Sequence, residues 1–429
     1  MKFRSAWILA GLLLLQASPV RAQDAAQEAR SSNQPVKLDG LLAEAEHNNP
    51  QIQAARHAWE SSRQVPSQIS TLPDPQFLLQ HVSVGSPRPF AGYSNSDFAY
   101  AGLGVSQDFP YPGKLRLRGE IAGKDADVLQ QRYESVRREI LADLKTACFQ
   151  FGYLAKRLAI LEEDGQLLLQ VEQASESRYR SGMGNQQEVL QAQLERTKLL
   201  REITVTQLEA GKVQAQIKQL LNRPQTSPDL ETFELSESKS AYTFDQLMSA
   251  AQANNPEIAG AQKMVERQEL QVNLARKDFY PDFNLQYMWQ RTDPAQFRAY
   301  YVVTLGVRVP IYRSRRQQPE LAQAQADQSR AKSEYETQSQ HIAFELRQQF
   351  LTVQRSEELL KIYREGLIPQ AQAALQAGLA AYQSNRLDFQ ALLASFRDVL
   401  KLSEEYWQAI SEHEAALAQL EAATGLSLR

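Results

Sequence analysis

The feature that most constrains this chain is an internal duplication with an offset close to 200 residues. Residues 41–55 (LLAEAEHNNPQIQAA) and 247–261 (LMSAAQANNPEIAGA) share seven identities in fifteen positions. Later landmarks recur in the same order: LPDPQF and YPDFNL, LGVSQDFPY and LGVRVPIY, and YRSG and YQSN. Solenoid repeats have units of about 20–50 residues. The longer spacing predicts a duplicated domain-sized unit, so both halves should adopt the same structure.

Composition narrows the class of protein. The 429 residues are 43% hydrophobic and rich in Gln, Ala, Leu, Glu and Arg, which is typical of long helices or coiled coils. The net charge of −3 argues against general nucleic-acid binding, which usually needs a basic domain. The chain contains no phosphate-binding Gly loop and no nucleophile motif, and its five His residues show no close metal-ligand spacing. We therefore expect a protein that is not an enzyme and that has no cofactor and no metal site.

The N-terminus predicts export. Lys2 and Arg4 precede an apolar run at 6–15 and the small-residue site ending at Ala22, which together indicate a secretory signal peptide too short to span a membrane. No Cys follows Ala22 directly, so a lipid anchor at a mature N-terminal Cys is not expected. The single Cys148 cannot form an internal disulfide and is expected to be a buried small side chain. No later run of about 18 apolar residues predicts a transmembrane helix.

Long helices with heptad-like seams are predicted in both halves. Apolar residues between 129 and 161 recur at steps of four and three, with one stutter. In the second half, one seam runs from Ile342 to Leu367 and another from Leu392 to Leu420. A weaker first-half counterpart of the last seam follows Leu190, Leu194, Thr197, Arg201, Ile203 and Leu208. If continuous, the helix at 114–178 is on the order of 100 Å long. Breaks are expected at 164–165 and 366–369.

The segment before each long helix alternates with a period of two, which indicates β-strands. The alternation is clear at 283–292 and 298–309 and poorer at 77–85 and 97–109. A length of about ten residues suits a tilted membrane-spanning strand. The alternative, a small soluble hairpin packed on a helical bundle, remains open. The residues expected to face lipid are Phe283, Leu285, Tyr287, Trp289, Tyr301, Val303, Leu305 and Val307.

Four strands imply more than one chain. Lipid offers no hydrogen-bond partner to a strand edge, so membrane strands must close into a barrel. Eight strands would give an interior filled by side chains, whereas twelve strands from three copies are expected to leave a lumen. The polar residues Asn284, Gln286, Gln290, Thr304 and Arg308 could line that lumen. The sequence therefore predicts a homotrimer.

Basic clusters follow the last strand of each half. Their members are Lys114, Arg116 and Arg118 in the first half, and Arg313, Arg315 and Arg316 in the second. Cations near a helix N-terminus oppose the helix dipole, so another group should compensate them. Lipid phosphates at the periplasmic face of the membrane could do so, and a merely solvated helix start is the alternative.

The predicted organisation has two repeats behind an exported leader. It comprises a signal peptide at 1–22, a flexible segment at 23–36, a first repeat at 37–235 and a second repeat at 236–429. The β-hairpins are expected at about 76–110 and 282–310, and the tips of the helical hairpins at about 180–186 and 383–388. The fold class is mainly α with a small transmembrane β part. Each repeat contains a helix, a β-hairpin and a long helical hairpin.

The signal peptide, the duplication, the paired hairpins and the two tips together resemble the TolC-type outer-membrane efflux channels. The resemblance covers residues 36–426, and its carriers are the two NNP segments, SQDFPYPGKLRLRGEIA and the tip segments YRSGMGNQQEVLQAQ and YQSNRLDFQALLAS. It implies a trimer with four strands per chain and an α-helical periplasmic tunnel in a Gram-negative-type outer membrane. It also implies docking to a periplasmic adaptor and an inner-membrane pump. FPYPGKLRLRGEIA is similar to the branch that includes heavy-metal cation efflux channels.

The resemblance also implies roles for the tips. The residues expected to dock the adaptor or to gate the pore are Arg180, Ser181, Gly182, Met183, Gly184, Ser384, Asn385, Arg386, Leu387 and Asp388. Glycines at 182 and 184 would permit the tight turn between antiparallel helices, which a plain helix–loop–helix would need equally. Glu188 and Asp388, tripled by symmetry, could form a carboxylate ring that favours cations.

Two functions follow from different classes of protein. The first is a passive outer-membrane duct that conducts metal cations or small toxic compounds from a pump and adaptor to the exterior. The alternative is a periplasmic coiled-coil adaptor or scaffold of an export machine, with its strands in a small soluble β-domain. Extraction behaviour separates them, because only the duct should require detergent.

Overall fold

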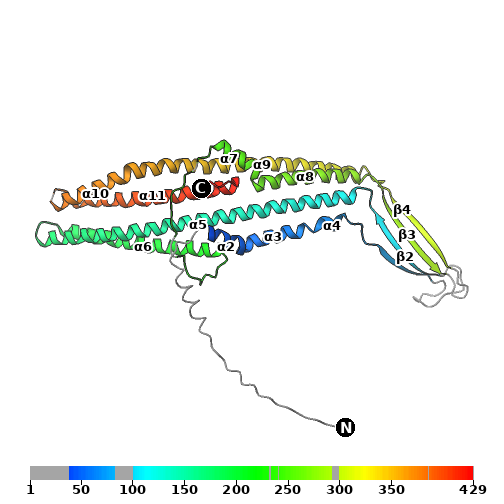
Figure 1. Cartoon of the computed structure of the whole chain (residues 1–429), viewed down its shortest axis with the longest axis horizontal. Helices are drawn as coiled ribbons and strands as arrows, with labels where there is room; N and C mark the ends of the chain where they lie inside the picture. Colours follow the sequence, from blue (N-terminus) through cyan, green and yellow to red (C-terminus); the bar gives the residue numbers. More distant parts are fainter. Residues whose placement is uncertain are drawn as a thin grey trace, which may run out of the picture.

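The chain forms an elongated, mainly helical molecule with one small sheet at one end (Figure 1). The structure is a computed structural model, and the residues that it describes are 38–82, 100–230, 233–239, 241–291, 299–384 and 386–428. The expected signal peptide and the segment at 23–36 lie outside these residues, as does Asn385. None of the described helices combines the length and the apolarity needed to cross a membrane.

The first repeat contains a long helical hairpin. Helix α5 (Lys114–Arg180) runs for 67 residues to the tip, and α6 (Gln186–Leu220) returns antiparallel to it. At 1.5 Å per residue, α5 is about 100 Å long, as expected. The predicted break at Asp164–Gly165 was wrong, because α5 continues through both residues. A mid-helix Gly costs only about 1 kcal/mol relative to Ala, and packing of α5 against α6 and α11 supplies far more.

The second repeat has the same hairpin with an interruption. Its outgoing arm consists of α9 (Gln317–Ile362), the π-helical turn η1 (Tyr363–Leu367) and α10 (Ile368–Gln383). The returning arm is α11 (Phe389–Thr424). The irregularity expected at 366–369 is therefore present, as a π-helical turn. A π-helical turn interrupts the regular i→i−4 ladder without ending the rod.

The apolar seams are confirmed in three arms and wrong in the fourth. On α6, Leu190, Leu194 and Leu208 are exposed, whereas Ala192 and Leu199, seven residues apart, are buried. The small side chain of Ala192 lets α6 approach its neighbours closely, so this heptad position faces inward and the larger leucines remain outside. An apolar row thus lies on the outer side of the first hairpin.

Short helices precede each strand pair and lie along the rods (Figure 1). They are α2 (Leu38–Asn48), α3 (Pro50–Ser62) and α4 (Val65–Ser70) in the first repeat, and α7 (Phe244–Asn254) and α8 (Pro256–Lys277) in the second. The cores between the helices are apolar. Cys148 is fully buried among them, as predicted, and burial raises the pKa of its thiol to about 12.

The repeated NNP motif is explained by a helix clamp. Asn49 Oδ1 accepts hydrogen bonds from two backbone N–H groups in the first turn of α3, at 2.9 and 3.3 Å, and its Nδ2 donates to Leu220 O at the end of α6, at 2.8 Å. Asn255 makes the same three bonds between α8 and Ala423 O of α11, at 2.9, 3.2 and 3.0 Å. One buried amide in each repeat thus caps one helix start and holds the end of another.

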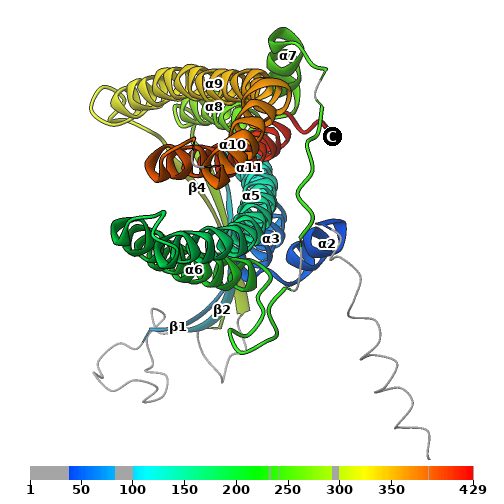
Figure 2. The same ribbon diagram turned by 90° about the vertical axis from the view of Figure 1, so that its left-hand side faces the viewer.

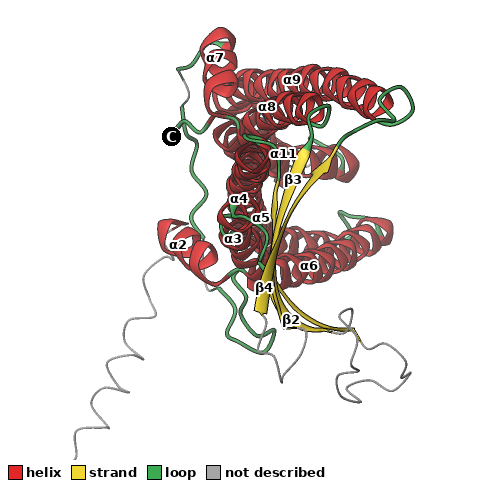
Figure 3. Ribbon diagram, turned by 90° about the vertical axis from the view of Figure 1, so that its right-hand side faces the viewer, coloured by secondary structure: helices red, strands yellow, loops and turns green. Residues whose placement is uncertain are grey.

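The four strands form one antiparallel sheet in the order β1-β2-β3-β4 (Figure 3). They are β1 (Gln76–Val82), β2 (Tyr100–Phe109), β3 (Asp282–Arg291) and β4 (Ala299–Arg308). The two repeats join in the middle of this sheet, because β2 of the first pairs with β3 of the second. Within the described part of the chain, β1 and β4 each pair on one side only.

Candidate functional site

One face of the sheet is a continuous apolar surface. In the β3–β4 register the expected lipid-facing residues lie directly opposite each other as pairs, among them Leu285 with Leu305 and Tyr287 with Val303. Phe283 is half-buried, and the other seven of these eight residues are exposed in the single chain. The register also orients the first-repeat strands, which the sequence left open: Leu103 pairs with Trp289 on the same face. An exposed apolar sheet face of this extent marks an interaction surface.

The opposite face of the sheet is mostly polar, although Met288, Val302 and Tyr300 also lie on it. Asn284, Gln286 and Arg308 of the expected lumen row share it, and Asn284 Nδ2 donates to Asp108 Oδ1 at 2.8 Å. Near its middle, Met288 lies over Gly104, where an added Cβ would come within 2.7 Å of a backbone oxygen. The sheet therefore presents one polar and one apolar side, as a wall between water and lipid would.

At the other end of the molecule, the two hairpin tips lie side by side (Figure 2). The first tip is a turn between Arg180 and Gln186, in which Gly182 adopts a φ of 73° and Gly184 packs against Arg178. Both glycines are therefore required by the turn itself. The exposed side chains here include Met183 and Arg180, the latter paired with Glu176 at 3.3 Å.

The second tip lies between α10 and α11. Asp388 is the N-cap of α11, and its Oδ1 accepts a hydrogen bond from Ala391 N at 2.8 Å. Ser384 caps the end of α10, and Leu387 is half-buried beside Arg386. The two tips thus meet at a shallow pocket of about 510 Å³, which is lined by Gly182, Met183, Gly184, Arg386, Leu387 and Asp388 but not by Arg180, Ser181 or Ser384.

A buried hydrogen-bond network joins the two tips. Tyr382, which is 2% exposed, donates from its hydroxyl to Glu188 Oε2 at 2.9 Å, and this hydroxyl lies 3.1 Å from Ser175 Oγ. Arg178 stacks over the Tyr382 ring, 4.5 Å from its centroid, and donates to Tyr382 O at 2.6 Å. Burial raises the pKa of Tyr382, and the bond to Glu188 adds to this effect. The network links α10 to both α5 and α6.

Sequence reasoning found Glu188 of this network but missed Tyr382, Arg178 and Ser175. A signal existed, because Tyr179 and Tyr382 open the matching segments YRSG and YQSN. Only the packing separates them, since Tyr179 is exposed and Tyr382 is buried. The carboxylates proposed for a cation ring, Glu188 and Asp388, line the same tip pocket, each with a hydrogen bond inside the chain.

At the junction between sheet and helices, the structure corrects the expected source of charge compensation. Lys114 is buried, and its Nζ lies 2.9 Å from Asp282 Oδ1 and 3.1 Å from Asp278 Oδ1. Arg116 and Arg316 pair with glutamates one helical turn later, at 3.0 and 3.2 Å. The protein itself therefore compensates these three cations, and Lys114 is not available to lipid phosphates. The remaining members, Arg118, Arg313 and Arg315, are exposed.

Comparison with solved structures shows the same fold over nearly the whole chain. The outer-membrane channel OprN matches with a TM-score of 0.81 at 18% identity, covering 91% of this chain and 90% of that chain. CusC, a protein described with transmembrane channel formation, matches with a TM-score of 0.80 at 17% identity, covering 91% and 92%. The outer membrane protein VceC from Vibrio cholerae matches with a TM-score of 0.77 at 17% identity, covering 91% and 97%.

Sequence comparison gives the family. A comparison with curated proteins finds no match to this chain. The sequence profile of the outer membrane efflux proteins matches twice, at residues 41–223 and 247–426, in keeping with the duplication. Because these two segments span most of the chain, this protein belongs to the outer membrane efflux protein family and is located in the outer membrane.

Proposed function

We propose that three copies of this chain close a twelve-stranded barrel in the outer membrane and continue as a helical tunnel into the periplasm. The observation that carries this proposal is the sheet itself, whose edges β1 and β4 are each paired on one side only and whose outer face is apolar. Strand edges in lipid must be paired, and three four-stranded sheets joined edge to edge meet that need. The polar face then surrounds a lumen.

The helical part supports the same assembly. The outer sides of α6 and α9 both carry exposed apolar side chains, including Leu190 and Leu208 on α6 and Phe344 and Leu351 on α9. End-on, these helices lie at opposite margins of the helical layer (Figure 2). Contact between α6 of one copy and α9 of the next would bury both rows and complete a tube.

We infer that this duct is the exit channel of a tripartite efflux system. Its substrates would be metal cations or small toxic compounds that a periplasmic adaptor and an inner-membrane pump deliver. The tips around Gly182 and Asp388 would dock these partners at the periplasmic end. The buried Tyr382–Glu188 bond holds the two tips together, so a partner that separates them would widen the mouth of the pore. Conduction itself needs no catalytic group.

The test is conductance of the detergent-purified protein in a planar bilayer, compared with Asp388→Ala at low and high salt. Discrete cation-preferring channels, with a preference that falls in the variant, would support the duct and the carboxylate ring. Channels unchanged by the variant would keep the duct and remove the ring. Protein that stays in solution without detergent and forms no channel would overturn the duct and favour the periplasmic adaptor alternative.

A further inference from the structure

The two long outgoing helices, α5 and α9, each begin with a buried polar side chain, and these two side chains differ in their hydrogen-bond partners. Lys114 is the first residue of α5 and Gln317 the first residue of α9, and they are 3% and 7% exposed. Lys114 has two carboxylate partners, whereas Gln317 Oε1 has no hydrogen-bond partner among the described residues. A buried amide oxygen left without a donor is destabilising, because it loses its hydrogen bonds to water without replacing them. The second junction is therefore incomplete in a single chain.

The first junction shows what completes such a site. The start of β3 lies against the turn that follows β2: Asp282 Oδ1 accepts from Tyr111 N at 2.8 Å and from Lys114 Nζ at 2.9 Å. The ring of Tyr280 stacks on Tyr111, with centroids 4.6 Å apart. The Pro281-Asp282 pair at the start of β3 thus packs against the start of α5, the helix that follows β2, and Asp282 provides its hydrogen-bond acceptor.

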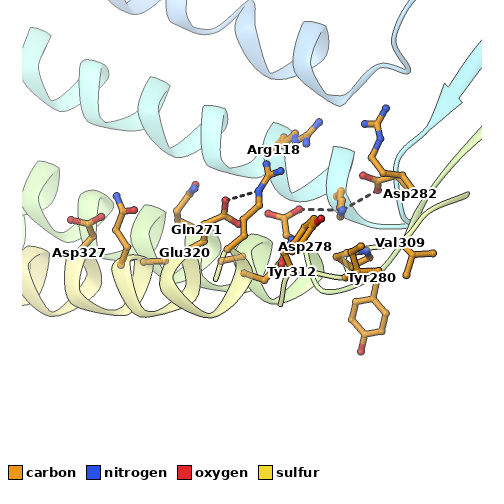
Figure 4. Close-up of a pocket in the computed structure, with 18 residues that line it drawn as sticks. Arg118, Gln271, Asp278, Tyr280, Asp282, Val309, Tyr312, Glu320 and Asp327 are labelled. Carbon is orange, nitrogen blue, oxygen red and sulfur yellow. Dashed lines mark hydrogen bonds and ion pairs between the residues drawn. The ribbon is translucent and has the colours of Figure 1, made fainter. Parts of the chain in front are cut away.

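The corresponding parts of the second junction lie at opposite edges of the sheet. The turn after β4 exposes Tyr312, which is 68% accessible beside Gln317, and borders a pocket of about 700 Å³ (Figure 4). The matching Pro-Asp pair, Pro73-Asp74, precedes β1, and both Asp74 and the preceding Leu72 are exposed. β1 and β4 are the two edges of the described sheet, so these parts do not pair within one copy.

We propose that residues Leu72–Asp74 of a neighbouring copy occupy this pocket, with the carboxylate of Asp74 in the role that Asp282 has within the chain. The proposal rests on the three-copy assembly proposed above. The Gln317 amide would present its NH2 group to Asp74 and its carbonyl to a backbone N–H of the same segment. Tyr312 would pack on Leu72, as Tyr111 packs on Tyr280. Arg308 also lines the pocket, whereas Arg316 there is already paired with Glu320.

The internal pairing also fixes a register for the contact between copies. Val105 pairs with Tyr287 inside the chain. When the two LGV segments are aligned, Val105 corresponds to Val307. When the two Pro-Asp segments are aligned, Tyr287 corresponds to Leu79. Val307 of one copy should therefore lie directly opposite Leu79 of the next, and both belong to the apolar face.

A double-mutant cycle tests the site in the full-length protein. Gln317→Lys recreates the Lys–Asp pairing of the first junction, so it should strengthen the detergent-solubilised trimer by about tenfold in its dissociation constant. Asp74→Asn should weaken the trimer and abolish the gain from Gln317→Lys. The matched control is Gln318→Lys, which adds the same charge at the exposed neighbouring position and should change little. A Gln317→Lys gain that persists in the Asp74→Asn background would overturn the proposal.

Cysteine cross-linking keeps the proposal testable if a charge variant fails to fold. Side chains directly opposite across antiparallel strands have Cβ atoms about 4.5–5.5 Å apart, which is close to disulfide range. In a Cys148→Ala background, Leu79→Cys with Val307→Cys should form a disulfide between copies, and Leu79→Cys with Val303→Cys should not. The opposite result would refute the register. A trimeric channel in which Gln317→Lys and Asp74→Asn act independently would overturn this site alone. Absence of any trimer would overturn the proposed function as well.

Discussion

The two repeats place the same elements in the same order, yet their outgoing arms differ. In the first repeat this arm is a single α-helix through Gly165, and in the second it changes at a similar position to a π-helical turn that contains Gly366. Near the tips, Tyr179 is exposed and Tyr382 is buried. The two repeats thus share a scaffold, while the irregular turn and the tyrosine that joins the tips belong to the second repeat. We therefore expect movement to concentrate in the second repeat.

The largest expected effect tests whether the two repeats are equal in the membrane. Val303→Arg with Leu305→Arg should prevent assembly in the outer membrane, because each charge facing lipid near the midplane costs about 2–4 kcal/mol. Leu79→Arg with Leu103→Arg in the first repeat should be equally damaging, since these residues lie on the same face. Trimer yield in outer-membrane fractions is the measurement. Thr304→Arg, on the polar face, is the control, and equal yield from both pairs and the control would contradict the assigned facing.

The helix clamps of Asn49 and Asn255 should contribute equally to the free energy of unfolding. Asn255→Ala removes two hydrogen bonds to the start of α8 and one to the end of α11, so it should lower the free energy of unfolding by about 1–3 kcal/mol. Asn49→Ala should cost a similar amount in the first repeat. Thermal unfolding followed by circular dichroism measures both. The preceding residue of each motif provides the control, because Asn48→Ala and Asn254→Ala leave the clamps intact; similar losses there would contradict the assignment.

The tips should show the repeats as unequal. Tyr382→Phe deletes the hydroxyl that donates to Glu188, and a hydrogen bond to a charged group contributes about 1.5–3 kcal/mol. If the bond holds the tips closed, this variant should raise the open probability of channels in a planar bilayer by about tenfold or more. Tyr179→Phe, at the exposed matching position, is the control. Equal conductance in both variants would show that the bond does not restrain the pore.

A pH test compares Asp164 with the exposed Glu365 of the second outgoing arm. Burial raises the pKa of Asp164 from 3.8 to about 6, with smaller contributions from Glu163 and Glu404. Because the folded-state pKa is higher than the unfolded one, this group lowers stability as the pH rises from about 4, and the loss is complete above about 6. Asp164→Asn should therefore stabilise the protein by about 1 kcal/mol at pH 7, after allowance for partial exposure, and change little at pH 4. Unfolding midpoints at both pH values test this, and Glu365→Gln should show no such difference.

The last prediction, a small change in helix stability, concerns Gly165 and Gly366 in the two outgoing arms. Gly165→Ala and Gly366→Ala should each raise helix stability by about 0.5–1 kcal/mol, because an added Cβ meets Leu199 at an ordinary 3.4 Å in the first case and nothing within 4 Å in the second. Only Gly366→Ala lies in the π-helical turn, so only it should reduce the frequency of channel opening. Single-channel recordings distinguish the two. Equal gating in both variants would show that the turn is not a hinge.

Much of the fold could be predicted from the sequence because its signals are local and periodic. The heptad steps of α5 and the alternation of β3 and β4 each depend on one face being buried or apolar, and both were found with nearly correct ends. The tips were expected from the matching segments YRSG and YQSN and from the family resemblance, and the φ of 73° at Gly182 explains the glycine in the first turn. The function of these tips stays a prediction. The break at Gly165 was wrong because tertiary packing outweighs the cost of one glycine.

The amino-acid sequence alone predicted the duplicated unit, the long helical hairpins and the apolar and polar faces of the strands, because periodicity records which side of an element avoids water. Which of two matching residues is buried or paired depends on tertiary contacts. The tertiary structure buried Tyr382 and exposed Tyr179, gave Lys114 its carboxylates and left the Gln317 amide oxygen without a donor. Such differences arise from neighbours about 170–200 residues away along the chain, and no local pattern in the sequence encodes those distances.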